Sequence, residues 1–370
     1  MLDDVLKHFH VMVEERSSDL ILRSGHRPVV RVDGGIKFLS DAIFTEEQGE
    51  LLSRHILNED ELEEFYGGNC EKDTAFVVPG AGRFRCNMMR QRRQTAFVFR
   101  HVKETVPSME ELYLPADVMR RLSMLSRGLV LVTGIAGSGK STTLATMIDY
   151  MNSHTHRHIV TIEDPIEFIF QDRKCAITQR EVGIDTDSCG TALKAAVRQT
   201  PDVILVGEMR DKETIMAALM AAETGHLVLS TLHTVNAVQT VERIISFFPP
   251  HQHDTIRMQL SLVLEGIVSQ RLITRRSTEG RVPAVEVLIG TPTVKEMVLE
   301  GRTRELHEAV EDGHQYYGSQ SFNQCLVGLV RQGIIDFDDA VTAADNPDEL
   351  KLALRGITKG VNHLEQLYGT

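Results

Sequence analysis

The chain has 370 residues, of which 42% are hydrophobic and 25% are charged. This mixture is typical of globular proteins and excludes collagen-like or wholly disordered chains, and the length allows two domains of ordinary size. Forty Lys and Arg residues against 52 Asp and Glu residues give a formal net charge of −12, which argues against a surface coated by nucleic acid. Aromatic residues make up 5% and Trp is absent, which argues against a large base-stacking platform.

Cysteine usage and hydropathy indicate a soluble protein of the cytoplasm. The five cysteines, at positions 70, 86, 175, 189 and 325, include no CxxC pair, so we expect reduced thiols and no zinc site. The first ten residues lack the apolar core of a signal peptide. No apolar stretch approaches the roughly 18 residues of a transmembrane helix.

The first 105 or so residues predict a small α+β domain. Apolar residues at the start recur with helical spacing and form one stripe: Leu2, Val5, Leu6, Phe9, Met12 and Val13. Short strands are expected at 19–23, 28–33, 74–78, 82–90 and 94–102. A segment with two prolines, 103–115, predicts a linker, which divides the chain into domains at 1–102 and 116–370.

From residue 127 onward, apolar β-branched runs alternate with helical stretches. The expected strands are 128–133, 158–162, 202–207, 227–231 and 283–289. The expected helices are 141–152, 191–198, 213–224, 254–270, 321–331 and 347–355. Continuous apolar strands separated by helices are typical of a mostly parallel sheet covered on both faces, so the fold class is α/β with a helical C-terminal end.

The strongest motif is GIAGSGKS at 134–141, a complete GxxxxGK[ST] P-loop between a predicted strand and a predicted helix. Glycines let successive backbone N–H groups and the helix N-terminus point at a phosphate. We expect Lys140 to reach the β- and γ-phosphates of ATP and the Ser141 hydroxyl to bind Mg²⁺. The residues expected to contact the nucleotide are Gly134, Ile135, Ala136, Gly137, Ser138, Gly139, Lys140, Ser141 and Thr142.

Polar residues follow three other predicted strands, where a doubly wound sheet binds its ligands. Glu163 begins an acidic pair that either orients water toward a γ-phosphate or forms a solvated turn. A buried apolar strand is followed by Glu208, the Walker B arrangement, in which the carboxylate reaches Mg²⁺ usually through water. His226 and His233 bracket the next strand, and either one reaches a phosphate or both are ordinary hydrogen-bonded residues at strand ends.

Six arginines lie within 18 residues of the N-terminal region: Arg83, Arg85, Arg90, Arg92, Arg93 and Arg100. Three interpretations stay open. The arginines form the solvated face of an edge hairpin, or they bind an anion or nucleic acid. Alternatively, they complete a neighbouring subunit's site by neutralising charge on the γ-phosphoryl group.

Taken together, these segments resemble the secretion-type ATPase superfamily, and within it the PilT/PilU family of type IV pilus retraction ATPases. The resemblance covers nearly the whole chain and includes the P-loop, the family's Asp box, Walker B run and His box, and runs at 18–22, 28–34, 83–87, 247–250 and 321–324. Residues 178–186, TQREVGIDT, are similar to the retraction members. Residues 293–300 match the PilT C-terminal motif poorly, and 346–355 are closer to PilU.

The resemblance implies a homohexameric Mg²⁺-dependent ATPase at the cytoplasmic face of the inner membrane. Each subunit would have an N-terminal PAS-like domain and a RecA-like ATPase domain. The implied partners are the inner-membrane pilus platform protein and other pilus-base components, through which the ring associates peripherally with the membrane, and no nucleic acid. A related secretion, conjugation or pilus-assembly ATPase is the alternative, and a nucleic-acid motor or a subunit that binds nucleotide without hydrolysing it is less favoured.

Matched position by position, the resemblance also implies roles for individual residues. Glu163 would polarise the attacking water, and Glu208 would be the Walker B acid. His233 would contact the γ-phosphate, with His226 its partner in the same box. The remaining roles belong to arginines: Arg85 and Arg100 would reach ATP, and Arg210 would sense the nucleotide state.

Overall fold

The computed structural model describes residues 1–15, 17–32, 35–103, 105–277 and 280–356. The chain divides into an N-terminal unit, residues 1–105 with 167–169, and a C-terminal unit, residues 106–166 with 170–370. The boundary falls within the expected linker at 103–115. Met109 and Leu114 of that segment are buried in the core of the C-terminal unit, so only the first few residues of the segment lie outside it.

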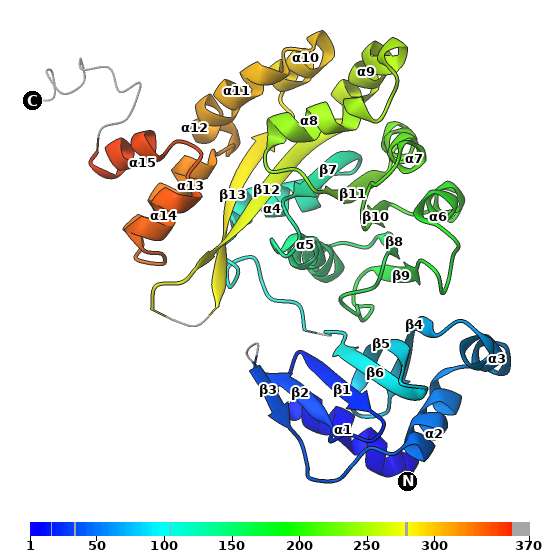
Figure 1. The fold of residues 1–370 in the computed structure, drawn as a ribbon. Helices are drawn as coiled ribbons and strands as arrows, with labels where there is room; N and C mark the ends of the chain where they lie inside the picture. The colour runs from blue at the N-terminus through cyan, green and yellow to red at the C-terminus, as the bar shows by residue number, and fades with distance from the viewer. Residues whose placement is uncertain (16, 33–34, 104, 278–279, 357–370) are drawn as a thin grey trace, which may run out of the picture. The chain divides into compact units, whose positions relative to one another are not determined.

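The N-terminal unit is built on a six-stranded antiparallel sheet in the order β3-β2-β1-β6-β5-β4 (Figure 1). Its strands are β1 (Asp19–Arg23), β2 (Val29–Val32), β3 (Gly35–Phe38), β4 (Glu71–Val78), β5 (Gly82–Gln91) and β6 (Gln94–His101). The amphipathic start is confirmed as α1 (Leu2–Glu14), which buries Val5, Phe9 and Met12.

Two helices that the sequence analysis did not anticipate join β3 to β4. They are α2 (Glu46–Ile56) and α3 (Glu59–Gly67). Each begins with a reciprocal capping box, between Thr45 and Gln48 and between Asn58 and Glu61. In such a box, the cap and the third helical residue satisfy each other's backbone N–H groups. These spacings were readable in the sequence.

The arginine-rich hairpin of β5 and β6 lies in the middle of this sheet. β4 pairs with the outer side of β5, and β1 pairs with the outer side of β6. The interpretation as an edge hairpin is therefore wrong. Hairpin partners are adjacent in sequence, whereas the flanking strands come from distant segments that local pattern does not reveal.

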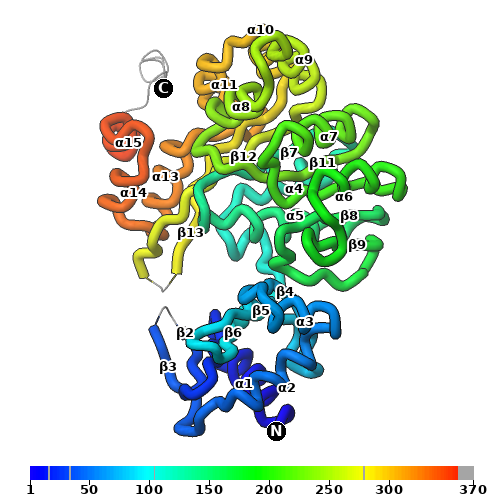
Figure 2. Tube along the Cα trace, turned by 45° about the vertical axis from the view of Figure 1, so that its right-hand side comes forward, coloured from blue at the N-terminus to red at the C-terminus, as the bar shows by residue number. Residues whose placement is uncertain are grey.

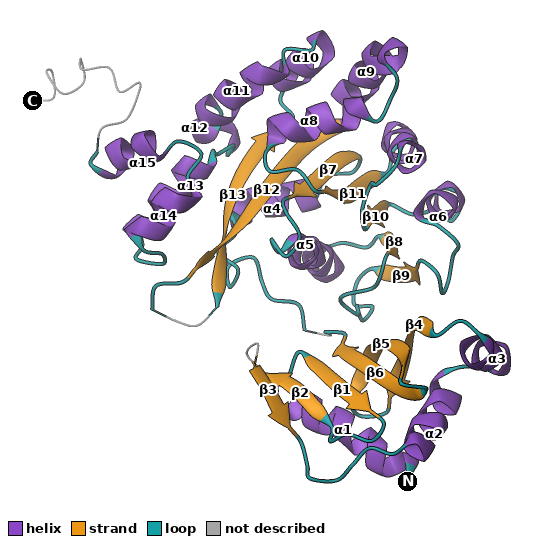
Figure 3. Ribbon diagram, in the orientation of Figure 1, coloured by secondary structure: helices purple, strands orange, loops and turns teal. Residues whose placement is uncertain are grey.

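The C-terminal unit contains a seven-stranded sheet in the order β13-β12-β7-β11-β10-β8-β9, with helices on both faces (Figure 3). Its strands are β7 (Gly128–Thr133), β8 (His158–Glu163), β9 (Ala176–Glu181), β10 (Val203–Val206), β11 (Leu227–Leu232), β12 (Leu264–Thr274) and β13 (Arg281–Ile289). All neighbouring strands are parallel except β12 and β13. The predicted α/β fold is thereby confirmed.

Two apolar cores cover the faces of this sheet. On one face, the sheet packs against α4 (Ala116–Ser123) and α5 (Lys140–His154). On the other face, it packs against α6 (Cys189–Ala196), α7 (Lys212–Glu223), α8 (Ala237–Ser246), α9 (His253–Val263), α10 (Pro292–Glu300) and α11 (Leu306–Asp312). Successive residues of β7 alternate between the two cores, with Leu129 and Leu131 in one and Val130 and Val132 in the other. Burial on both sides explains the continuous apolar strands.

The helical C-terminal end packs on the extended β12–β13 hairpin (Figure 2). Its longer helices are α13 (Phe322–Arg331), α14 (Phe337–Ala343) and α15 (Pro347–Leu354), preceded by the short α12 (His314–Tyr317). The helices expected at 321–331 and 347–355 are confirmed.

The helix expected over 254–270 is wrong beyond Val263, where α9 ends and β12 begins. From Leu264 the chain pairs with β7 on one side and β13 on the other. At Gly266 a Cβ would lie 2.9 Å from a methyl group of Leu122, so α4 approaches the strand closely there. Tertiary pairing overrides the apparent helical pattern, which is common for short apolar runs.

Candidate functional site

Four motifs meet at the carboxyl edge of the seven-stranded sheet. β7, β11, β10 and β8 are consecutive, parallel strands. The P-loop begins directly after β7 at Gly134, His233 follows β11, Glu208 lies two residues beyond β10, and Glu163 is the last residue of β8. Neighbouring strands are spaced about 5 Å apart, so the edge from P-loop to Glu163 spans roughly 15 Å. That length suits the phosphates of a nucleoside triphosphate together with a bound metal ion and an attacking water.

The backbone of the P-loop depends on glycine. Gly134, Gly137 and Gly139 have φ angles of 148°, 74° and 93°, a region that L side chains rarely adopt. A Cβ at Gly134 would also lie 2.4 Å from Ser138 Oγ and 2.6 Å from the carbonyl oxygen of Gln270. The loop therefore packs tightly against β12 before it turns into α5.

The same loop has the features of an anion cradle. Gly139 is the N-cap of α5, so the first N–H groups of this helix have no side-chain cap. Lys140 is buried, and its Nζ donates to the carbonyl oxygens of Gly134 and Ile135 at 2.9 and 3.0 Å. Within the described part of the chain, the buried Ser138 Oγ has no hydrogen-bond partner. A phosphate would satisfy these donors, because anions bind at helix N-termini.

Sequence reasoning missed a buried residue beside this loop. Gln270 of β12 is 1% exposed, and its Nε2 donates to Thr143 Oγ1 of α5 at 2.8 Å. Its own backbone carbonyl is the group that approaches Gly134. No sequence signal pointed to it, because residue 270 was assigned to a helix and lies 127 positions from Thr143.

Glu208 is the centre of a charged cluster. Its Oε2 lies 3.0 Å from Arg210 Nε, and its Oε1 lies 3.3 Å from His233 Nε2. Arg210 also contacts Asp164 Oδ2 at 3.4 Å. The hydrogen bond and charge of Glu208 raise the pKa of Arg210. These residues from three strand ends are thus brought together, and Glu208, Arg210 and His233 line a cavity of about 560 Å³ with residues of α8.

Backbone contacts hold the segment that carries Glu208. Gly207 N–H donates to the carbonyl oxygen of Ile162 at 2.8 Å, and a Cβ at Gly207 would approach that oxygen to 3.3 Å. Thr231 Oγ1 donates to the Gly207 carbonyl oxygen at 2.6 Å, and Met209 N–H donates to the Thr231 carbonyl oxygen at 3.1 Å. The loop after β10 is thereby fixed to the ends of both neighbouring strands.

Glu163 is half-buried and accepts two side-chain hydrogen bonds on one oxygen. Thr161 Oγ1 donates to Glu163 Oε1 at 2.7 Å, and Gln179 Nε2 donates to the same oxygen at 3.2 Å. Thr161 and Gln179 are paired across β8 and β9, so both side chains leave the same face of the sheet as Glu163. Glu163 is therefore held in a defined orientation, which a solvated turn would not provide.

The structure separates the two histidines expected together. His226 precedes β11, next to the residue pair Leu227 and Gly128 at which β11 and β7 begin. A strand of six residues spans about 20 Å, so His226 lies at the opposite edge from the P-loop. Its ring is hydrogen-bonded to the Ala221 carbonyl oxygen at 2.8 Å. We therefore do not carry His226 into the nucleotide site proposed below.

Arg85 and Arg100 belong to the N-terminal unit, where they form part of one row across the sheet. Arg85 of β5 is paired with Arg100 of β6. Asp19 of β1 is paired with Arg100 on one side and with Arg31 of β2 on the other. Arg100 donates twice to Asp19 Oδ1, at 3.0 and 2.7 Å. All four side chains leave the face opposite the aromatic core, because Phe84 and Phe99 alternate with them into it.

Comparison with known proteins shows the family of this chain. The family model described as type II/IV secretion system protein matches residues 76–335. PilT of Pseudomonas aeruginosa, described as a type IV pilus retraction ATPase, is 42% identical over 93% of this chain and 99% of its own length. The type IV pilus ATPase PilU of the same organism is 40% identical over 98% of this chain and 94% of its own length. The chain belongs to the PilT/PilU family of secretion-type ATPases.

Solved structures agree with this assignment. The crystal structure of the pilus retraction motor PilT with bound ADP has a TM-score of 0.86 and 42% identity, and covers 94% of this chain and 98% of its own. DotB, an ATPase of Legionella pneumophila, has a TM-score of 0.72 and 26% identity, and the match covers 96% of this chain and 95% of DotB.

In the described residues, every helix is too short or too polar to cross a membrane.

Proposed function

We propose that this chain is the subunit of an ATP-hydrolysing motor that powers retraction of the type IV pilus. The observation that carries the proposal is the gathering of the P-loop, Glu208, His233 and Glu163 at one sheet edge, in a chain 42% identical to PilT over nearly its whole length. We further infer that the C-terminal unit is a RecA-like ATPase domain and the N-terminal unit a PAS-like domain, as the family resemblance implies.

In this proposal, the P-loop binds ATP. The backbone N–H groups at 134–142 surround the phosphates, and Lys140 exchanges its two carbonyl partners for β- and γ-phosphate oxygens. Ser141 and Glu208 would hold Mg²⁺, Glu208 through water. The ion, when bound, supplies positive charge that neutralises the phosphate oxygens.

Hydrolysis requires an ordered water in line with the γ-phosphate. Glu163 would accept a proton from this water, because its carboxylate is held at the end of β8 by two donors. His233 would donate a hydrogen bond to the γ-phosphate when its contact with Glu208 is exchanged. Arg210, paired with Glu208 and Asp164, would change partner when the γ-phosphate leaves and so register the nucleotide state.

The remaining roles concern the assembly. We infer a homohexamer in which Arg85 and Arg100 reach ATP of the same or a neighbouring subunit and stabilise charge on the γ-phosphoryl group. Loss of phosphate would then loosen the contact that ATP makes between the two domains and let them rotate about the linker at 103–115. The ring would act at the cytoplasmic face of the inner membrane, on the pilus platform protein and other pilus-base components. A related secretion, conjugation or pilus-assembly ATPase is the alternative.

Complementation tests the proposed motor. In a strain lacking this chain, we expect loss of twitching motility, with rescue by the wild type and by Lys174→Ala, an exposed lysine of the same unit. Lys140→Ala should not restore motility and should lack ATP hydrolysis when purified. Full rescue by Lys140→Ala would contradict a motor role. Unimpaired pilus retraction with defective secretion in the deletion strain would favour the alternative.

A further inference from the structure

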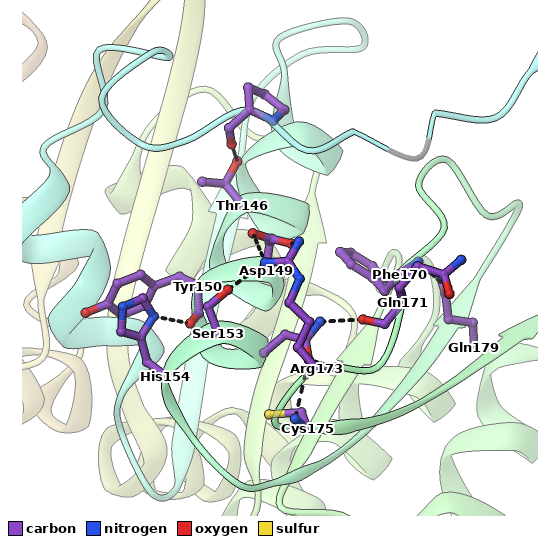
Figure 4. A network of polar contacts seen from close by, with 12 residues as sticks. Thr146, Asp149, Tyr150, Ser153, His154, Phe170, Gln171, Arg173, Cys175 and Gln179 are labelled. Atoms are coloured by element: carbon purple, nitrogen blue, oxygen red, sulfur yellow. Dashed lines mark hydrogen bonds and ion pairs between the residues drawn. The ribbon is translucent and has the colours of Figure 1, made fainter.

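The side chain of Gln179 joins Glu163 to Phe170, the first residue of the C-terminal unit after the segment 167–169. At one end, its Nε2 donates to Glu163 Oε1 at 3.2 Å. At the other end, its Oε1 accepts the backbone N–H of Phe170 at 3.0 Å. Gln179 is half-buried on β9, and Figure 4 shows it beside Phe170. A single amide therefore bonds to both the proposed catalytic carboxylate and a loop backbone.

The loop that contains Phe170 leaves the C-terminal unit and returns to it. Residues 167–169 belong to the N-terminal unit, and Phe170 is the first residue after them. Within the N-terminal unit, Phe168 is 4% exposed and forms a bridge with Lys103, and Ile169 N–H donates to the Lys103 carbonyl oxygen at 3.0 Å. The residues just before Phe170 are thus anchored to Lys103, two residues beyond the end of β6.

The chain after Phe170 is fastened to α5. Asn152 Nδ2 donates to the Gln171 carbonyl oxygen at 2.8 Å, and Asn152 Oδ1 accepts the Arg173 N–H at 3.0 Å. The Arg173 guanidinium pairs with Asp149 at 2.9 Å and donates to Ser153 Oγ at 2.7 Å (Figure 4). Because residues 171–173 are fixed to the helix that follows the P-loop, Phe170 is the point where a movement of 167–169 would first be felt.

We propose that Gln179 is a positioning residue that orients Glu163 and makes this orientation depend on the segment 167–169 of the N-terminal unit. The inference rests on the proposed role of Glu163. When 167–169 moves, the Phe170 N–H pulls on the Gln179 amide, and the amide in turn shifts its hydrogen bond to Glu163. Rearrangement of the N-terminal unit would then switch hydrolysis on or off without displacing the P-loop. If Gln179 only joined β9 to the loop, replacing it would leave the orientation of Glu163 unchanged.

Two substitutions in the purified full-length chain separate these roles. Gln179→Glu keeps the shape and the acceptor for Phe170, but puts a carboxylate oxygen where the donor to Glu163 was. We expect like charge to raise the pKa of Glu163 and move the acid limb of the kcat–pH profile upward by about 0.5 unit or more. Gln179→Ala should lower kcat about 10-fold and change the KM for ATP less than about 2-fold. Circular dichroism melting shows whether each variant is folded.

Gln171→Ala is the matched control, because this exposed glutamine makes no side-chain hydrogen bond with any residue the structure describes. It should keep the wild-type kcat and pH profile. A profile of folded Gln179→Glu that superimposes on the wild type would overturn the inference. Glu163→Gln distinguishes a failure of this inference from a failure of the role proposed for Glu163. If this variant retains the wild-type kcat, the role of Glu163 is wrong, and the inference about Gln179 is wrong with it.

The dependence on segment 167–169 has its own test. Phe168→Leu reduces the packing of this segment, and we expect kcat to fall a few-fold in the wild-type background. In the Gln179→Ala background, the same substitution should have no further effect on kcat, because the connection is already broken. Equal fold-changes in both backgrounds would show that Gln179 transmits nothing from the segment.

Discussion

Arg85 and Arg100 lie directly opposite each other on β5 and β6, yet only Arg100 of the two has an acidic partner in the described residues. Arg100 donates twice to Asp19, which is 6% exposed and also lies 3.7 Å from Arg31. The Arg85 guanidinium has no hydrogen-bond or ion-pair partner among these residues. One arginine is therefore tied into the sheet, and the other is available to a ligand.

This difference predicts two phenotypes. Arg85→Ala should abolish most ATP hydrolysis and leave the free energy of unfolding within about 0.5 kcal/mol of the wild type. Arg100→Ala should also lower hydrolysis, but should destabilise the chain by about 1 kcal/mol, because Asp19 Oδ1 loses both hydrogen bonds from Arg100. Urea unfolding followed by circular dichroism, with a phosphate-release assay, measures both. Arg54→Ala, an exposed arginine of α2, is the control and should change neither quantity.

Glu163 and Glu208 should differ in their dependence on Mg²⁺. Glu208→Gln removes the charge that would attract the ion, so we expect the Mg²⁺ concentration for half-maximal hydrolysis to rise about 10-fold or more. Glu163→Gln should lower kcat at least about 100-fold with ATP affinity and Mg²⁺ dependence unchanged. Mg²⁺ titrations of hydrolysis and of nucleotide binding separate the two effects. Exchanged phenotypes would reverse the assignment of the two acids.

The two histidines should differ because they lie at opposite edges of the sheet. His233→Asn removes the partner of Glu208 and should reduce kcat roughly 100-fold, as expected for the loss of one transition-state donor. His226→Asn, at the other end of β11, should change kcat less than about 2-fold. Steady-state kinetics of the two variants side by side provide the comparison. Equal losses would place His226 in the catalytic machinery.

A buried carboxyl group should make stability depend on pH. Glu286 of β13 is 4% exposed, and its Oε1 accepts the N–H of Ala237 at 2.7 Å, at the start of α8. Burial raises the pKa of Glu286 from 4.5 to about 7. Between these pH values, the folded chain holds a proton that the unfolded chain has released. The contribution of Glu286 to stability therefore falls as pH rises and is fully unfavourable above pH 7.

Glu286→Gln keeps an acceptor for Ala237 and removes the titration. Relative to the wild type, we expect its free energy of unfolding to rise by up to about 3 kcal/mol as pH increases from 4.5 to 7. Urea unfolding at several pH values measures this difference, with Glu265→Gln, an ion-paired acid at the edge of the same unit, as the control. A difference that does not vary with pH would mean that Glu286 is ionised in the fold.

Much of the fold and part of the site were predictable from local sequence. The strands β7, β8, β10, β11 and β13 come from largely apolar runs. The residues at or just after the carboxyl ends of the first four, Gly134, Glu163, Glu208 and His233, were recognised by type and spacing. The P-loop was predictable because its conformation needs glycine at defined positions, which few other sequences satisfy. The resemblance to a known ATPase family then assigned these motifs to one nucleotide site.

Other features were decided by contacts between distant segments. The sequence of β12 predicts the end of a helix, but the segment forms a strand because it pairs with β7 and β13. This pairing also places Gln270 beside the P-loop. His226 and His233 bracket β11 in the sequence, and its parallel pairing with β7 decides that His233 is the one at the edge with the P-loop. Gln179 belongs to the site because β9 lies next to β8.

By itself, the sequence determined the P-loop, the type of most elements and the chemical character of the strand ends in the site, because these depend on residues within a few positions of one another. The tertiary structure decided which strand ends are neighbours, which arginine is tied to Asp19 and which glutamine bonds to Glu163. The physical reason is that hydrogen bonds and burial act over a few ångströms in space, whatever the separation along the chain.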